Sequence, residues 1–121
     1  ARTFYIPSVK LVLDTSALLY IVDKKVGLEA LEGFEIYVPE AVVEELKTLA
    51  KRKKKARVAL ALLEIIKATL CQETGPADDA VLKCALKLGA VLVTGDEELA
   101  ERGRRAGIAV GKFYKKQLAI Y

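Results

Sequence analysis

The stretch ADDAVLKCALKLGAVLVTGDEEL, from Ala77 to Leu99, contains the unit from which the fold can be predicted. Its apolar residues recur at helical spacing from Asp78 to Leu88, and Gly89 is a residue type that commonly ends a helix. Ala90 to Val93 is a short apolar run that is typical of a buried strand. A further helix is expected after Thr94-Gly95-Asp96. The unit is therefore a helix, a buried strand, an acidic turn and a second helix.

A buried strand followed by an acid also occurs near the N-terminus. Val9 to Leu13 predicts a strand that ends at Asp14, and Thr15-Ser16 offer hydroxyls to open the next helix. Ile36 to Val38 predicts a second short strand. It stops at Pro39, which suits an early helical position.

The rest of the chain continues the alternation of helices and strands. Further elements are expected as helices from Pro39 to about Leu49 and from Ala56 to Leu70, a loop from Cys71 to Ala77, a helix ended by Gly107, and strands at Ile108 to Val110 and Leu118 to Ile120. Strands that alternate with helices pair in parallel, and nearly continuous apolar strands are covered on both faces. We predict an α/β fold, a three-layer sandwich with a central parallel sheet of four to five strands flanked by helices.

The size and composition of the chain fit one domain. Its 121 residues suit a single domain over residues 1–121, and a hydrophobic content of 53% supplies a core. The best candidate for a membrane span, Ala17 to Val22, is far shorter than the roughly 20 residues required. The N-terminus lacks the pattern of a secretory signal, so we expect a cytoplasmic location without membrane attachment. The absence of Asn, His and Met beside abundant Lys and Glu suggests a thermophile.

The two cysteines, Cys71 and Cys84, do not form a recognisable metal site. Their spacing is not that of a CxxC motif, and the chain has no histidine, which argues against structural zinc. Cytosolic proteins rarely keep disulfides. We therefore expect two reduced, half-buried thiols rather than a disulfide.

Acids follow two of the predicted buried strands and occupy one side of a predicted helix. Asp14 and Asp96 stand at strand ends, where open α/β sheets bind their ligands. At about 100° per residue, Glu45 lies at the edge of the buried stripe of its helix, whereas Glu44 points to solvent. Three acids are therefore expected near one edge of the sheet.

Asp78 supplies a fourth acid at the start of the helix that precedes the Ala90 strand. The angular test places Asp78 on the apolar side of that helix and Asp79 nearer its margin. The apolar residues on the same side are Val81, Leu82, Ala85 and Leu86.

Each of the four acids also has a purely structural interpretation. Asp14, Asp78 and Asp96 can cap helices or complement helix dipoles, and Glu45 can be a boundary residue with its carboxylate in water. Capping alone does not require four acids at one edge of one sheet.

Clustered carboxylates predict a cation. They repel one another at neutral pH unless a cation neutralises them. An all-oxygen donor set without His or Cys favours Mg²⁺ or Mn²⁺ over zinc. Such ions activate water and stabilise charge on a phosphate during in-line attack, so the predicted substrate is a phosphodiester.

The ordered motifs resemble those of the PIN-domain ribonuclease family. The matching segments cover nearly the whole chain and are LVLDTSALL (Leu11 to Leu19), VPEAVVEEL (Val38 to Leu46), the Ala77 to Leu99 stretch, and GIAV (Gly107 to Val110). The resemblance implies an endoribonuclease that uses Mg²⁺ or Mn²⁺ and a metal-bound water, and that leaves 5′-phosphate and 3′-hydroxyl ends. Its catalytic and metal-binding acids would be Asp14, Glu45, Asp78 and Asp96, with Ser16, Thr94 and Asp79 in support.

Two roles within the family remain open. One is a toxin of the VapC kind, inhibited by a small antitoxin protein, and the other is a nuclease of ribosomal RNA processing. The ADD sequence, the GxxV ending and the basic helix tip look more like archaeal processing-type members. Homodimers are frequent in the family, so a homodimer is also expected as an option, as is an RNA-processing protein partner.

A basic block departs from the family pattern. It consists of Lys51, Arg52, Lys53, Lys54 and Lys55, with Arg57 following, in a chain of net charge +4. These side chains can neutralise RNA phosphates, and Arg102, Arg104 and Arg105 can extend the same footprint. The structural alternative is a solvated connector between two helices.

Other classes of protein fit the pattern less well. A catalytically inactive PIN-like module that binds RNA or protein is the main alternative, although all four acids are present. A receiver domain would leave the helix acids unexplained. A haloacid-dehalogenase phosphatase would have a second Asp two residues after Asp14, where this chain has Ser16.

Overall fold

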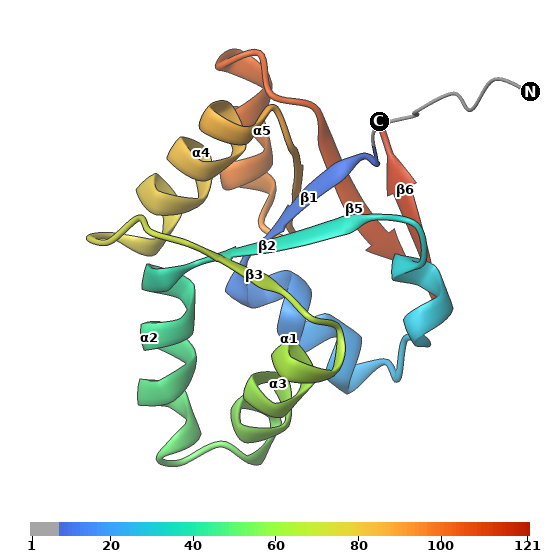
Figure 1. The fold of residues 1–121 in the computed structure, drawn as a ribbon, viewed down its shortest axis with the longest axis vertical. Coiled ribbons are helices and arrows are strands. Elements are labelled where there is room, and N and C mark those ends of the chain that lie inside the picture. Colours follow the sequence, from blue (N-terminus) through green and yellow to red (C-terminus); the bar gives the residue numbers. More distant parts are fainter. Residues whose placement is uncertain (1–7) are drawn as a thin grey trace, which may run out of the picture.

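The chain folds around a six-stranded sheet, seen as a ribbon in Figure 1. The computed structural model describes residues 8–121, so residues 1–7 of the expected domain lie outside the described residues. The strands are β1 (Lys10–Leu13), β2 (Glu35–Pro39), β3 (Thr69–Cys71), β4 (Val91–Val93), β5 (Val110–Tyr114) and β6 (Gln117–Ile120). The helices are α1 (Thr15–Asp23), the 3₁₀ helix η1 (Leu28–Leu31), α2 (Glu40–Ala50), α3 (Lys54–Ile65), α4 (Ala77–Leu88) and α5 (Glu97–Arg105).

The strand order places a topological switch point between β1 and β4. The order across the sheet is β3-β2-β1-β4-β5-β6, so the chain builds outward from β1 and then returns to its other side. Leu13 at the end of β1 is in register with Val93 at the end of β4. The residues that follow these two strands therefore emerge side by side, in the crevice where such sheets bind ligands.

Helices cover both faces of the sheet, and the predicted α/β fold is confirmed. In Figure 1, α1 and α3 lie on one side of the strands and α4 and α5 on the other. Strands β1 and β4 are almost wholly buried between these layers, which explains their continuous apolar sequences. Helix α2 continues directly from β2 and contacts both α3 and α4. Among the described residues, no helix has the length and hydropathy to cross a membrane.

The sheet has more strands than predicted. The helix expected from Ala56 to Leu70 ends at Ile65, and Thr69–Cys71 instead forms β3 at the sheet edge. Lys67 adopts a left-handed conformation with φ of 53°, which ends the helical path. The strand expected at Ile108 to Val110 begins at Val110 and runs on to Tyr114.

The last strand is antiparallel to its neighbour. The fifth predicted strand, Leu118 to Ile120, is present as β6, and it pairs with β5 in antiparallel register. Only Lys115 and Lys116 separate the two strands, and Lys115 has a φ of 57°. Because a two-residue connection allows a hairpin but no crossover, β6 cannot be parallel.

Helix α4 has its predicted bounds but a rotated apolar face. It ends at Gly89, whose φ of 62° is the left-handed conformation expected of a glycine there. Its buried residues are Ala80, Val81, Cys84 and Ala85. Leu86, which was predicted on the buried face, is 57% exposed.

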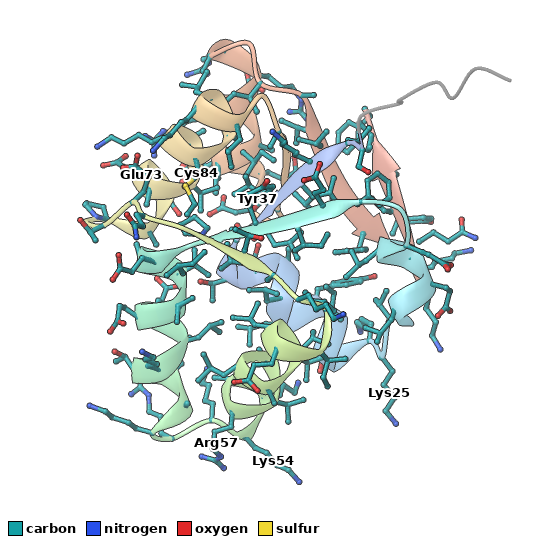
Figure 2. All side chains as sticks on the ribbon, viewed as in Figure 1. Lys25, Tyr37, Lys54, Arg57, Glu73 and Cys84 are labelled. Carbon is teal, nitrogen blue, oxygen red and sulfur yellow. A yellow bond between two sulfur atoms is a disulfide. The ribbon has the colours of Figure 1, made fainter. Side chains whose placement is uncertain are left out.

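Cys71 and Cys84 form a disulfide, so the prediction of two reduced thiols is wrong. The bond joins the end of β3 to the middle of α4, and Figure 2 shows the sulfur bond beside the labelled Cys84 and Glu73. Both residues are at least 93% buried, with exposures of 7% and 0%. The bond therefore closes a covalent loop that contains Asp78.

Candidate active site

Asp14 combines a capping role with a place in the crevice. It is the N-cap of α1, and its carboxylate accepts a hydrogen bond of 2.8 Å from the backbone N–H of Ala17. Ser16 donates from its hydroxyl to the same carboxylate at 2.8 Å, and Thr94 also donates to it. Asp14 is only 6% exposed. The capping interpretation is thus correct, and it leaves Asp14 at the switch point. The prediction that the Thr15 and Ser16 hydroxyls open this helix is not what the structure shows.

The turn after β4 is fixed to the turn after β1. Ser16 accepts a bond of 2.9 Å from the backbone N–H of Gly95, and its hydroxyl lies 3.3 Å from that of Thr94. Thr94 accepts a bond of 3.0 Å from the N–H of Asp96. Asp96 in turn caps α5, accepting bonds of 2.9 and 3.2 Å from the N–H groups of Glu98 and Leu99. The two predicted supporting hydroxyls therefore join the strand-end acids into one network.

A cleft of about 240 Å³ brings the four predicted acids together. Asp14 and Asp96 come from the strand ends, Glu45 from α2 and Asp78 from the first turn of α4. Glu45 lines the cleft, whereas Glu44 pairs with Lys47 at 3.3 Å on the outer surface of α2. The full lining is Asp14, Thr15, Ser16, Leu19, Val42, Glu45, Ala77, Asp78, Val81 and Asp96.

Electrostatics confirm that these carboxylates influence one another. Burial raises the pKa of Asp14 above its usual 3.8, against the lowering effect of its hydrogen bonds, and the charge of Asp78 adds to the rise. The pKa of Asp78 is raised by desolvation first, then by the charges of Asp96 and Glu45. Each charge therefore opposes ionisation of its neighbours.

The donor set of the cleft has the chemistry of a hard-cation site. Every candidate donor is an oxygen, and the Thr15 hydroxyl oxygen is buried at the cleft without a hydrogen-bond partner among the described residues. Sequence reasoning did not single out Thr15, because nothing in its spacing distinguishes it from an ordinary helix-opening residue. Across residues 8–121, however, no three acidic side chains lie close enough together to hold a metal ion as they stand. The chemistry of the donors fits Mg²⁺ or Mn²⁺, and closer approach of the acids would be needed to bind it.

Asp79 is not brought into the cleft. Its carboxylate accepts a bond of 2.8 Å from the guanidinium of Arg102 on α5. The two side chains are about half exposed, at 46% and 47%. Of the predicted supporting residues, Asp79 is thus the one that the structure directs to another partner.

The basic block lies at the far end of α2, and its members have different contacts. Figure 2 shows Lys54 and Arg57 at the opposite end of α2 from Glu73. Arg57 donates to the backbone carbonyl of Ala50 at 2.7 Å, where it complements the carboxyl end of α2. Lys55 forms an ion pair with Asp23 at the end of α1. These two side chains contact α1 and the end of α2, which the structural alternative of a solvated connector did not predict.

The sequence comparisons assign the family. The family model described as PIN like domain matches residues 11–116. The chain belongs to the PIN-like domain family. This PIN-like chain is also similar to ribonuclease VapC9 of Archaeoglobus fulgidus, with 33% identity over 109 residues that cover 83% of this chain and 79% of the relative. The predicted family is confirmed, and the protein is a homologue of an archaeal ribonuclease.

Solved structures show the same PIN-like fold. The PIN domain endonuclease Utp24 superposes with a TM-score of 0.77 and 17% identity, covering 92% of this chain and 90% of that one. A chain of the VapBC2 structure from Rickettsia felis, bound to a DNA fragment from their promoter, has a TM-score of 0.66 and 18% identity, covering 88% and 100%. At these identities the likeness concerns the fold alone.

Proposed function

We propose that this protein is a metal-dependent endoribonuclease that hydrolyses RNA phosphodiester bonds in the cleft of Asp14, Glu45, Asp78 and Asp96. The observation that carries the proposal is the meeting of these four carboxylates, from four separate elements, at the switch point of the sheet. Mutual repulsion among them makes a cation at this cleft favourable. The 33% identity to a ribonuclease supports RNA as the substrate.

Mg²⁺ or Mn²⁺ would be held by the four cleft acids. When bound, such an ion supplies a Lewis acid that activates water and stabilises negative charge on the phosphate. Asp14 presents its carboxylate in one orientation, because Ser16, Thr94 and the Ala17 N–H all donate to it. A carboxylate that is already oriented binds a cation without the loss of conformational entropy that ordering would require.

The remaining acids complete the proposed site from the two helices and the second strand end. Asp96 is held by the backbone of α5. Glu45 and Asp78 line the cleft from α2 and α4, and their carboxylates would attract a cation. We propose that Ser16 and Thr94 position Asp14 and the turn at Gly95 and contribute no direct chemistry.

The basic block supports RNA binding through its free members. We propose that Lys51, Arg52, Lys53 and Lys54 contact phosphates of RNA that extends beyond the cleft along α2. Lys55 and Arg57 already have protein partners, so we expect them to contribute less. Each such phosphate contact should steepen the fall of log RNA affinity with log salt concentration.

The cellular role is proposed from the relatives and from the basic block. Similarity to VapC9 favours a toxin held inactive by a VapB-type antitoxin, and the role in RNA processing is the second candidate, favoured by the basic block. Growth arrest on expression of the wild type, relieved by a protein that copurifies with it, would assign the toxin role. Normal growth with altered ribosomal RNA ends would assign processing.

The test is cleavage of a mixed set of structured and unstructured RNAs with Mn²⁺, Mg²⁺ or EDTA. The Asp14→Asn protein, purified in the same way, controls for contaminating nuclease. We expect cleavage that needs a metal ion and is reduced at least about a thousandfold by the substitution, or about 4 kcal/mol in the barrier. Analysis of the ends should show 5′-phosphates.

Two outcomes would reject the nuclease. Cleavage that survives both EDTA and Asp14→Asn would indicate contamination or a different mechanism. Metal-independent RNA binding without cleavage would instead assign a catalytically inactive PIN-like module.

A further inference from the structure

Arg102 forms an ion pair with Asp79 that links two helices, each of which begins at or near a cleft acid. Arg102 belongs to the last turn of α5, whose N-cap is the cleft acid Asp96. Its partner Asp79 belongs to the first turn of α4 and directly follows the cleft acid Asp78. The Asp79–Arg102 pair therefore links the two helices that carry half of the acidic cluster.

The charge of Arg102 reaches into the cluster. It lowers the pKa of Asp78, opposing burial and the neighbouring carboxylates, and both Asp78 and Asp79 raise the pKa of Arg102. Only one bond of the guanidinium, from Nη2 to Asp79, is made within residues 8–121, and the side chain is 47% exposed. A guanidinium has five N–H donors, so most of them remain for a ligand.

The other arginines of α5 have different surroundings. Arg104 pairs with Glu101 on its own helix at 3.4 Å and lies 5.0 Å from the ring centre of Tyr121. Arg105 pairs with the same Glu101. Among the three, Arg102 is the one anchored to the helix that carries a cleft acid.

From this placement we propose that Arg102 is a phosphate-binding residue for the RNA substrate, held in place by Asp79, the residue that directly follows the cleft acid Asp78. The inference rests on the proposed nuclease function and adds a contact that the acids cannot supply. Four carboxylates repel the RNA backbone, and a fixed guanidinium beside them offsets this repulsion. Arg suits the role because its planar fork matches two phosphate oxygens. Asp79 is then a positioning residue rather than a metal ligand.

The experiment measures binding without cleavage. Affinity for a short fluorescein-labelled single-stranded RNA is measured by anisotropy in EDTA over a series of salt concentrations. Arg102→Ala is compared with Arg104→Ala, which removes the same charge from the same helix turn but leaves the pair with Asp79 intact. Circular dichroism confirms that both variants fold.

We expect Arg102→Ala to weaken binding about five- to tenfold and to reduce the slope of log affinity against log salt by about 0.7, the value for one phosphate contact on a single strand. Arg104→Ala should change affinity less than about twofold. With Mn²⁺, the KM for RNA cleavage by Arg102→Ala should rise by a similar factor while kcat changes little.

If the wild-type protein cleaves RNA, equal losses of affinity for the two variants, or no loss for Arg102→Ala, would overturn the role of Arg102. The nuclease proposal would then stand. A wild type that neither cleaves nor binds RNA would overturn the proposed function, and the role of Arg102 with it.

Discussion

The two sides of the cleft are built differently. On the strand side, Asp14 and Asp96 are fixed by hydrogen bonds from hydroxyls and backbone N–H groups. On the helix side, Glu45 and Asp78 receive no hydrogen bond within the described part of the chain and project from exposed positions on α2 and α4. The strand side is therefore set by folding, whereas the side chains of the helix side can adjust their positions.

This contrast explains the separation of the acids. The strand side has its geometry before any ion binds, and its cost is the burial of the Asp14 charge. The helix side keeps its carboxylates more exposed, although burial still raises the pKa of Asp78. Under the proposed function, its acids would approach the strand side when a cation binds. Substitutions on the two sides should consequently differ in what they change.

Apart from the loss expected for Asp14→Asn, the largest expected effect is on catalysis from the helix side. Glu45→Gln keeps the size of the side chain but removes its charge, so we expect the rate of metal-dependent RNA cleavage to fall about a hundredfold or more, or roughly 3 kcal/mol. Stability should hardly change, because within residues 8–121 the carboxylate forms no hydrogen bond or ion pair. Glu44→Gln, one residue away on the outer surface, is the control and should cleave like the wild type. Similar rates for both would mean that α2 contributes no acid.

The next effect concerns the disulfide that holds the helix side. Replacing Cys71 and Cys84 together by Ala should lower the free energy of unfolding by about 3 kcal/mol, because the unfolded chain is no longer closed into a loop. Urea denaturation measures the change, and the wild type in a strong reductant should show a similar loss. Affinity for Mn²⁺ should also fall, since Asp78 lies within the loop. Unchanged stability would assign the bond no structural role.

On the strand side, Thr94→Val should act through stability. Thr94 is 2% exposed, donates to Asp14 and accepts from the N–H of Asp96. Removing its hydroxyl leaves both groups short of a partner and should cost about 2 kcal/mol in the free energy of unfolding. Thr74→Val, at an exposed loop position, is the control and should be near neutral. A neutral Thr94→Val would show that the network does not fix Asp14.

The smallest expected effect is a change in the free energy of unfolding with pH, caused by the buried carboxylate of Asp14. Because the folded-state pKa of Asp14 is raised above 3.8, the folded protein binds this proton more tightly than the unfolded chain. Its contribution to stability is greatest below pH 3.8, decreases as the pH rises through the raised pKa, and is constant above it. Asp78 contributes with the same sign.

Urea denaturation in EDTA across that pH range compares the wild type with Asp14→Asn, which retains the helix cap. We expect the substituted protein to lose less stability as the pH rises and to be the more stable protein at neutral pH. Asp23, whose pKa is lowered by Lys55, acts in the opposite direction but is common to both proteins. If the free energies of unfolding of the two proteins changed with pH in parallel, the buried charge at Asp14 would not be destabilising.

The sequence predicted those features that depend on local patterns. Strand β1 and its acid, the bounds of α4 and the choice of Glu45 over Glu44 follow from apolar runs, a terminal glycine and helical angle. Such signals are read within one element. They also sufficed for the fold, because alternating strands and helices determine parallel pairing.

The features that were missed depend on conformations or contacts that the local sequence does not reveal. Ala68 to Leu70 continues the apolar pattern of α3, and the left-handed Lys67, between the end of α3 and β3, breaks the helical path. The disulfide pairs two cysteines whose proximity arises from the β3–α4 connection. Asp79 differs from Asp78 only through Arg102, which lies 23 residues away in the chain.

The covalent loop between Cys71 and Cys84 has a consequence for proteolysis. The connection from Gln72 to Pro76 is largely exposed and is thus a natural target for a protease. A single cut there would leave the two fragments joined through sulfur, so the nicked chain would migrate as one band until it was reduced. The fragment bearing Asp78 would stay attached to the one bearing Asp14, and a protein with a broken backbone could still present both sides of its cleft.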